Sequence, residues 1–203
     1  MQDLDIRGAG NLLGAEQSGF ITDMGFETYQ KILAEAMEEL GVETGIVTRN
    51  TTDNYAVDCT IETDQLALIP DGYIDLTAEK IRIYKELDSI SNEKDLDIMK
   101  GKLTDRFGKI PVELERLFDI VRIRQLGVRL GFEKIIIKNG VLIAFFISNP
   151  LSQYYKSDRF SKILENISIH QQLFEIKQPD NRLRIVVRNV DSISKAYEIL
   201  KKL

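Results

Sequence analysis

The side chains with the clearest potential for chemistry lie in a glycine-dense segment near the start of the chain. Residues 3–19 read DLDIRGAGNLLGAEQSG. Glycines let a backbone approach a partner closely, and guanidinium and carboxamide groups hydrogen-bond well to phosphates and amides. The spacing therefore predicts a polar contact with a partner, without deciding which partner. The residues that could form it are Arg7, Gly8, Gly10, Gly14, Gln17, Ser18 and Gly19.

The same segment does not fit a nucleotide-binding loop. The dinucleotide pattern requires glycine where Leu13 stands, and it must follow a buried strand, which does not precede Arg7. The chain also has no Gly-Lys-Ser/Thr sequence, which a P-loop requires. A complete ATP site is therefore not expected within these residues, and we expect no cofactor for the chain alone.

Catalytic and metal-binding residues are not expected either. The chain has one histidine, His170, and one cysteine, Cys59, far apart in the sequence, so a nucleophile–histidine pair is not indicated. A single cysteine excludes an internal disulfide and a cysteine-ligated zinc site. Carboxylate pairs such as Asp95 and Asp97 are typical of a solvated surface.

Charge is distributed unevenly along the chain. The net charge is −5, but residues 1–100 carry −13 and residues 101–203 carry +8. This asymmetry has two readings: two solvated faces of one domain, or a basic surface that meets nucleic acid or an acidic partner.

Two groups of arginines could form such a basic surface. One group lies on a predicted helix over residues 111–130. The members of the other group are separated by even numbers of residues in a predicted strand, so their side chains would lie on one face of a sheet. Neither group has the interleaved aromatic residues of a single-strand stacking platform, which favours a protein-facing or solvated role. The candidates for phosphate or partner contacts are Arg122, Arg124, Arg129, Arg182, Arg184 and Arg188.

Hydrophobic periodicity predicts the elements that carry these residues. Apolar residues at helical spacing predict a helix over residues 23–40, and the polar stretch 41–54 has the composition of a linker. Alternation predicts a strand over 57–62. Three further helices are expected, over 77–90 with Thr77 as N-cap, over 92–107, and over 111–130 with Pro111 as its first residue.

The last seventy residues predict a repeated strand–strand–helix unit. The pair Asn139-Gly140 between two apolar runs predicts a type I′ hairpin, and a helix is expected over 151–167. Strands over 172–178 and 182–188 and a helix over 191–203 then repeat the order. The expected fold class is α+β: an N-terminal loop and helix segment, then a compact domain with one antiparallel sheet in a ββα ββα-like C-terminal half and a helical layer on one face.

The whole chain is expected to divide into residues 1–50 and a compact domain over 51–203. No apolar run approaches the roughly 20 residues that span a bilayer, so no membrane contact is expected. The acidic N-terminus lacks the basic and apolar regions of a secretion signal. These features and the single cysteine predict a cytoplasmic location.

The segment DLDIRGAGNLLGAEQSG resembles the end of the translocation motif shared by the transcription-repair coupling factor family and the RecG-type fork helicases, in the form typical of the coupling factors. Further stretches over residues 3–130 are similar to that family, and the similarity is diffuse from residue 131 onward. These stretches are Gly25-Phe26 with Tyr29, the helix to Leu40, LIPD at 68–71, IRIYK at 81–85 and DRFGKIP at 105–111.

The resemblance implies the function of a much larger bacterial protein. Members of the family are ATP-dependent DNA translocases that use ATP and magnesium, displace stalled RNA polymerase from double-stranded DNA and recruit excision repair through UvrA. It implies that this chain supplies part of the translocation motif, with Arg7 and Gln17 as the motif's functional arginine and glutamine. It also implies a C-terminal regulatory domain that makes an intramolecular contact with the UvrA-binding module and masks it.

The isolated chain is then expected to be a monomer that is not itself an enzyme. The alternative from the residues themselves is an autonomous DNA-binding module that uses the basic C-terminal half. A salt-sensitive complex with duplex DNA distinguishes this alternative from the regulatory role.

Overall fold

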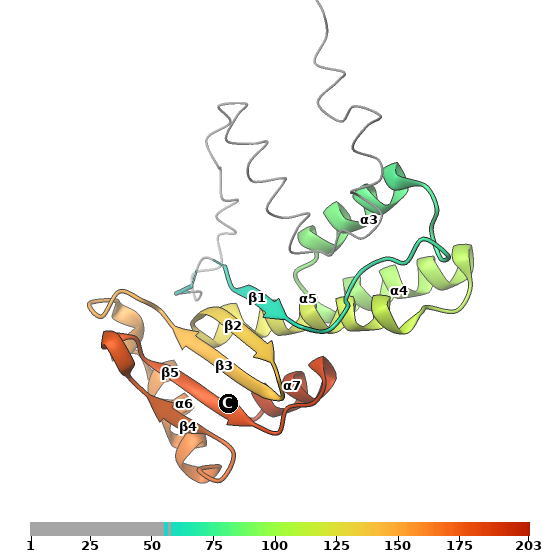
Figure 1. Cartoon of the computed structure of the whole chain (residues 1–203). Coiled ribbons are helices and arrows are strands. Elements are labelled where there is room, and N and C mark those ends of the chain that lie inside the picture. Colours follow the sequence, from blue (N-terminus) through green and yellow to red (C-terminus); the bar gives the residue numbers. More distant parts are fainter. Residues whose placement is uncertain (1–54, 57) are drawn as a thin grey trace, which may run out of the picture.

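A computed structural model describes residues 55, 56 and 58–203, so the predictions for the glycine-dense segment and for the helix over 23–40 lie outside the described residues. Between residues 55 and 203 the described chain forms five α-helices and one five-stranded sheet (Figure 1), which confirms the α+β class. The helices are α3 (Thr77–Ser89), α4 (Glu93–Phe107), α5 (Val112–Leu130), α6 (Asp158–Ile169) and α7 (Ile193–Leu200). The strands are β1 (Thr60–Thr63), β2 (Phe132–Lys138), β3 (Val141–Phe146), β4 (Glu175–Lys177) and β5 (Arg184–Arg188).

The strand order across the sheet is β1-β2-β3-β5-β4. Strands β2, β3, β5 and β4 pair in antiparallel fashion, and β2–β3–α6 followed by β4–β5–α7 reproduces the predicted repeat. The predicted antiparallel sheet of the C-terminal half is thus confirmed, and it gains a fifth strand that makes it mixed, because β1 pairs in parallel with β2, with Ile61 opposite Ile135. A parallel partner needs a long crossover, which α3, α4 and α5 provide, and a short alternating run does not specify strand direction.

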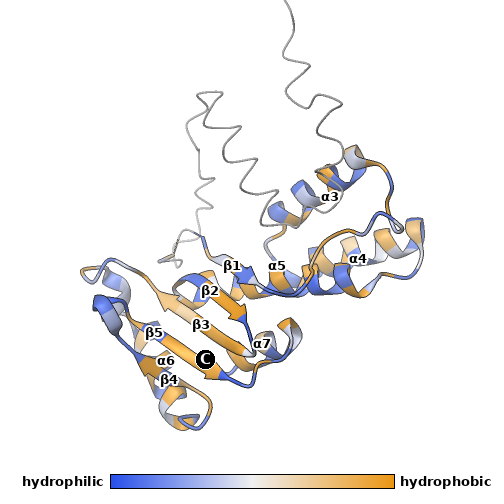
Figure 2. Ribbon diagram, in the orientation of Figure 1, coloured by the Kyte–Doolittle hydropathy of each residue, from blue (hydrophilic) through white to orange (hydrophobic). Residues whose placement is uncertain are grey.

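The two faces of the sheet differ in their cover. Helices α5, α6 and α7 lie behind the sheet in Figure 1, and on that side the strands bury an apolar layer. Its members are Ile135, Ile137, Leu142, Ala144, Phe146, Ile185 and Val187. We call the other side the open face; among the described residues no helix packs on it. Figure 2 shows β2, β3 and β5 as largely hydrophobic, a colour to which the residues of both faces contribute.

Helix ends follow local hydrogen-bond chemistry. The side chains of Asn92, Ser157 and Ser192 accept hydrogen bonds from the first turns of α4, α6 and α7, which satisfies donors that otherwise lack partners. Two predicted positions are shifted by one residue. Leu76 rather than Thr77 is the N-cap of α3, without a side-chain cap bond, and Pro111 is the N-cap of α5 rather than its first helical residue.

Helix α5 is the central element and is locked at its C-terminal end. Gly131 ends it in the left-handed conformation, with φ 77° and ψ 32°. The Tyr154 hydroxyl donates to the Leu130 carbonyl at 2.5 Å, and the Tyr154 ring lies directly against Gly131. Tyr154 also contacts Phe146 and Phe160 in an aromatic cluster. The turn after α5 is therefore fixed by one buried side chain.

The family-like stretch LIPD at 68–71 anchors the loop between β1 and α3. The Ile69 amide donates to the Tyr84 hydroxyl at 3.0 Å, and Asp71 pairs with Lys80, a charged side chain that is 5% exposed. Tyr73 reaches the other way and donates to the carbonyls of Leu103 and Gly108. The loop therefore joins α3 to α4, and these residues support the fold locally.

Candidate functional site

Arg124, one of the predicted contact residues, lies in an ion-pair network within the domain. Its Nε and Nη2 donate to the two carboxylate oxygens of Asp58 at 2.7 and 2.9 Å, and its Nη1 bonds Asp88 of α3. Burial lowers the pKa of Arg124, but Asp58 and then Asp88 outweigh it, so the net pKa is raised. The guanidinium therefore joins α5 to α3 and to the segment just before β1.

Arg122 occupies an equivalent position toward α4. It bonds Glu93 at 2.7 Å and Asp119 at 3.0 Å, and its side chain is 15% exposed. Burial lowers the pKa of Arg122, while Glu93 and Asp119 raise it by more. Burial also raises the pKa of Asp119 more than the Arg122 hydrogen bond lowers it. Both helix arginines are thus engaged by carboxylates of their own domain.

The remaining predicted arginines lie elsewhere on the surface. Arg129 is exposed in the last turn of α5 and lies apart from the ion pairs of Arg122 and Arg124. Arg184 and Arg188 lie opposite Phe145 and Val141 on the open face, as strand parity predicted. Arg188 bonds Glu175 of the neighbouring strand at 3.0 Å. The structure therefore brings the strand arginines together on one face and keeps the helix arginines separate from them.

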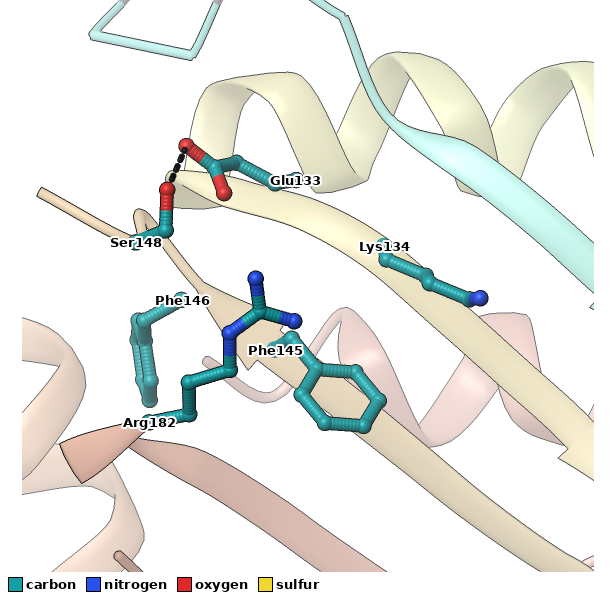
Figure 3. A pocket seen from close by; sticks show the side chains of 6 residues that line it. All are labelled: Glu133, Lys134, Phe145, Phe146, Ser148 and Arg182. Carbon is teal, nitrogen blue, oxygen red and sulfur yellow. Dashed lines mark hydrogen bonds between the residues drawn. The ribbon is translucent and has the colours of Figure 1, made fainter. Parts of the chain in front are cut away.

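Arg182 lines a shallow hollow at one end of the open face (Figure 3). The other lining residues are Glu133, Lys134, Phe145, Phe146 and Ser148. The Arg182 guanidinium lies between the two phenylalanine rings, and the Ser148 hydroxyl donates to Glu133 at 3.4 Å. No ion pair joins Arg182 or Arg184 to a carboxylate among residues 58–203, and the Arg184 Nε is buried without a hydrogen-bond partner there.

On each outer strand of the sheet, one glutamate forms ion pairs with two basic side chains. The sequence analysis did not predict this arrangement. Glu62 of β1 pairs with Lys134 at 2.5 Å and Lys138 at 3.0 Å. Glu175 of β4 pairs with Lys177 and Arg188. Hydrogen bonds from the paired bases lower the pKa of each carboxyl. Cross-strand register, which sequence alone did not reveal, brings these groups together.

Replacing Glu62 by Gln should lower stability at pH 7 by a few tenths of a kcal/mol to about 1 kcal/mol, because the pair is solvent-screened. The pKa of Glu62 is lower folded than unfolded, so its contribution is complete above the ordinary pKa and is lost as pH falls through the folded value. The wild-type and variant unfolding curves should therefore converge under acid conditions. Urea unfolding from pH 3 to 7 measures this, and a constant gap contradicts it.

Cys59 is completely buried where β1 packs against α5. Burial, then the charge of Asp58, raises the pKa of its thiol far above the usual range. Since only the thiolate reacts, the folded chain should show no reaction with Ellman's reagent at pH 8, and the denatured chain should show one thiol. Rapid reaction in the absence of denaturant would show that this packing is wrong.

His170 serves as the C-cap of α6, where its carbonyl accepts a hydrogen bond from the Leu173 amide at 2.8 Å. Within the described residues, no group of three or more His, Cys, Asp or Glu side chains could hold a metal ion. None of the helices between residues 55 and 203 is long and apolar enough to cross a membrane.

Comparison with solved structures identifies the fold. The fold matches the crystal structure of the C-terminal domain of a transcription-repair coupling factor with a TM-score of 0.57 and 21% sequence identity. The match covers 71% of this chain and 86% of that one. Residues 63–157 match the family described as the TRCF domain.

Sequence relatives lead to the same family. The chain is 33% identical over 201 residues to the transcription-repair-coupling factor of Rickettsia typhi, and 37% identical over 190 residues to that of Staphylococcus epidermidis. These matches cover 98% and 93% of this chain, but it spans only 17% and 14% of the two relatives. The chain belongs to the transcription-repair-coupling factor family.

Proposed function

We propose that this chain is the C-terminal portion of a DNA translocase that uses ATP and magnesium to displace stalled RNA polymerase from double-stranded DNA and recruits UvrA. The identity to coupling factors over nearly the whole chain supports this role. The chain spans about a sixth of those relatives. In this proposal the ATP site and the polymerase-binding module lie outside it. The chain alone should then hydrolyse no ATP.

In this proposal residues 51–203 are a regulatory domain that masks the UvrA-binding module through an intramolecular contact. The observation that supports it is that Arg122 and Arg124 are held by carboxylates of the domain itself, which makes them less available to nucleic acid. Contacts between domains of one chain are typically modest and polar, and such a contact can bias a two-state equilibrium. The exposed carboxylates and basic strand residues suit a contact of that kind.

Removing residues 51–203 from the full-length protein tests the masking role. The shortened protein should capture more UvrA in a pull-down than the intact protein does, because the masking contact is gone. ATPase activity of both forms serves as the control that the motor still folds. Equal capture by both proteins would contradict masking.

Residues 1–50 would supply the end of the translocation motif, in which Arg7 and Gln17 relay motor closure to DNA. In the full-length protein, Arg7→Ala should reduce DNA translocation in a triplex-displacement assay while DNA-dependent ATP hydrolysis persists. Lys31→Ala, a basic residue of the same segment outside the motif, is the matched control. Unchanged translocation by Arg7→Ala would remove that role.

The alternative function is an autonomous DNA-binding module. It is favoured by Arg182 and Arg184, which have no ion pair among the described residues, and disfavoured by the engagement of Arg122 and Arg124. A gel shift of the chain with a 30-base-pair duplex at low salt tests it. A complex that weakens steeply with added salt would support DNA binding, and no complex at low salt would exclude it.

A further inference from the structure

The open face carries an apolar row across its centre. Ile136, Ile143 and Val186 lie in register on β2, β3 and β5, on the side opposite α5, α6 and α7. Val186 is only 6% exposed, although it does not belong to the contiguous core on the helical side. Phe145 and Val141 extend the row on β3. The row is thus half-buried among its neighbouring side chains, and no described helix packs on it.

Basic side chains outnumber acidic ones around this row. The bases are Lys134, Lys138, Lys177, Arg182, Arg184 and Arg188, and the acids are Glu62, Glu133 and Glu175. Glu62 and Glu175 each hold two of the bases in ion pairs. The face therefore carries excess positive charge, and two of its bases, Arg182 at the hollow in Figure 3 and Arg184 opposite Phe145, have no ion pair among residues 58–203.

Arg184 lies over the open face and has no ion pair among the described residues. Its guanidinium carbon lies 5.7 Å from the centre of the Phe145 ring, which holds it over the face. Its Nε is buried and makes no hydrogen bond within residues 58–203. Arginine favours planar, bidentate acceptors such as carboxylates.

We propose that the open face is a docking surface for an acidic protein segment. Arg182 and Arg184 bind its carboxylates, and an apolar side chain next to them packs on Phe145 and Ile143. Charge complementarity selects the acidic partner, and the apolar row selects protein over nucleic acid. A phosphate backbone would leave Ile143 and Phe145 without a new apolar contact. Docking of an acidic segment on this face does not require the masking contact.

Selection from a random twelve-residue peptide display library against the 203-residue chain tests the proposal. Selected peptides should carry Asp or Glu beside Leu, Ile or Phe. A synthetic peptide of that consensus should bind the chain in a fluorescence polarisation assay. In ¹⁵N spectra of the labelled chain, the chemical shifts that change on adding the peptide should belong to residues of β3 and β5. The double variant Arg182→Gln/Arg184→Gln should bind it at least tenfold more weakly, because two charge-assisted contacts are lost.

Matched controls separate docking from general charge effects. Arg129→Gln/Lys202→Gln removes the same charge from α5 and the C-terminus, and it should bind the peptide like wild type. Thermal unfolding of the variants confirms that both fold. The proposal is overturned if no acidic consensus emerges, if the control pair weakens binding equally, or if a 30-base-pair duplex displaces the peptide. It is also overturned if the chain dimerises in sedimentation equilibrium and the Arg182→Gln/Arg184→Gln variant does not, because a second copy would then occupy the face.

Discussion

Gly131→Ala is expected to lower the free energy of unfolding by about 3 kcal/mol. Two costs combine at this position. A left-handed conformation costs a residue with a Cβ about 1–2 kcal/mol, and the φ of Gly131 is 77°. The new Cβ would also overlap the Tyr154 ring and lie 2.8 Å from its hydroxyl, which adds an overpacking cost of about 1–3 kcal/mol. Tyr154 is fully buried and bonded to Leu130, so it cannot move aside.

Alanine substitutions at three other glycines separate the cost of the left-handed backbone from the cost of the overlap. Gly140 has a φ of 72° but open space around it, so Gly140→Ala should cost only the backbone share, about 1 kcal/mol. Gly127 is helical, and its Cβ would lie 2.5 Å from the Cys59 Sγ, so Gly127→Ala isolates the overlap. Gly101 has neither constraint, and Gly101→Ala should stabilise α4 by up to about 1 kcal/mol. Urea unfolding of the four variants measures the series; a Gly131 loss no larger than that of Gly140 would show that Tyr154 does not block the site.

Helices and hairpins were the part of the fold that sequence could predict. Their signals are local: helical spacing of apolar residues over α3, α4 and α5, and the Asn139-Gly140 turn, where both residues have positive φ. The parallel pairing of β1 was not predictable in this way. It depends on a contact between Ile61 and Ile135 that three intervening helices bring about.

The roles of the arginines show the same limit. Strand parity predicted that Arg184 and Arg188 share a face, because parity is a local property. Whether an arginine is available to a partner depends on distant carboxylates. Arg124 bonds Asp58, which is 66 residues away, and Arg122 bonds Glu93, which is 29 residues away. Sequence therefore identified the charged groups, and tertiary structure decided which of them are engaged.

Arg124→Met should lower the free energy of unfolding by about 2–3 kcal/mol. Removing one partner of a well-buried ion pair costs about 3–5 kcal/mol, and the effect is smaller here because Asp58 and Asp88 are partly exposed to water. Methionine keeps the volume of the side chain, so the loss reports the three hydrogen bonds rather than a cavity. Urea unfolding at pH 7 provides the measurement. Arg124→Lys keeps the charge without the bidentate geometry and should lose an intermediate amount.

A double-mutant cycle with Asp58→Asn shows whether the pair itself supplies this stability. We expect a coupling free energy of about 1–2 kcal/mol between Arg124 and Asp58, since charged neighbours in one network are not additive. Arg129→Met, an exposed change on the same helix, should alter stability by no more than about 0.5 kcal/mol. A more stable Arg124→Met variant would mean that burying the guanidinium costs more than its ion pairs return. Arg124 would then be retained for contact with a partner rather than for joining α3, β1 and α5.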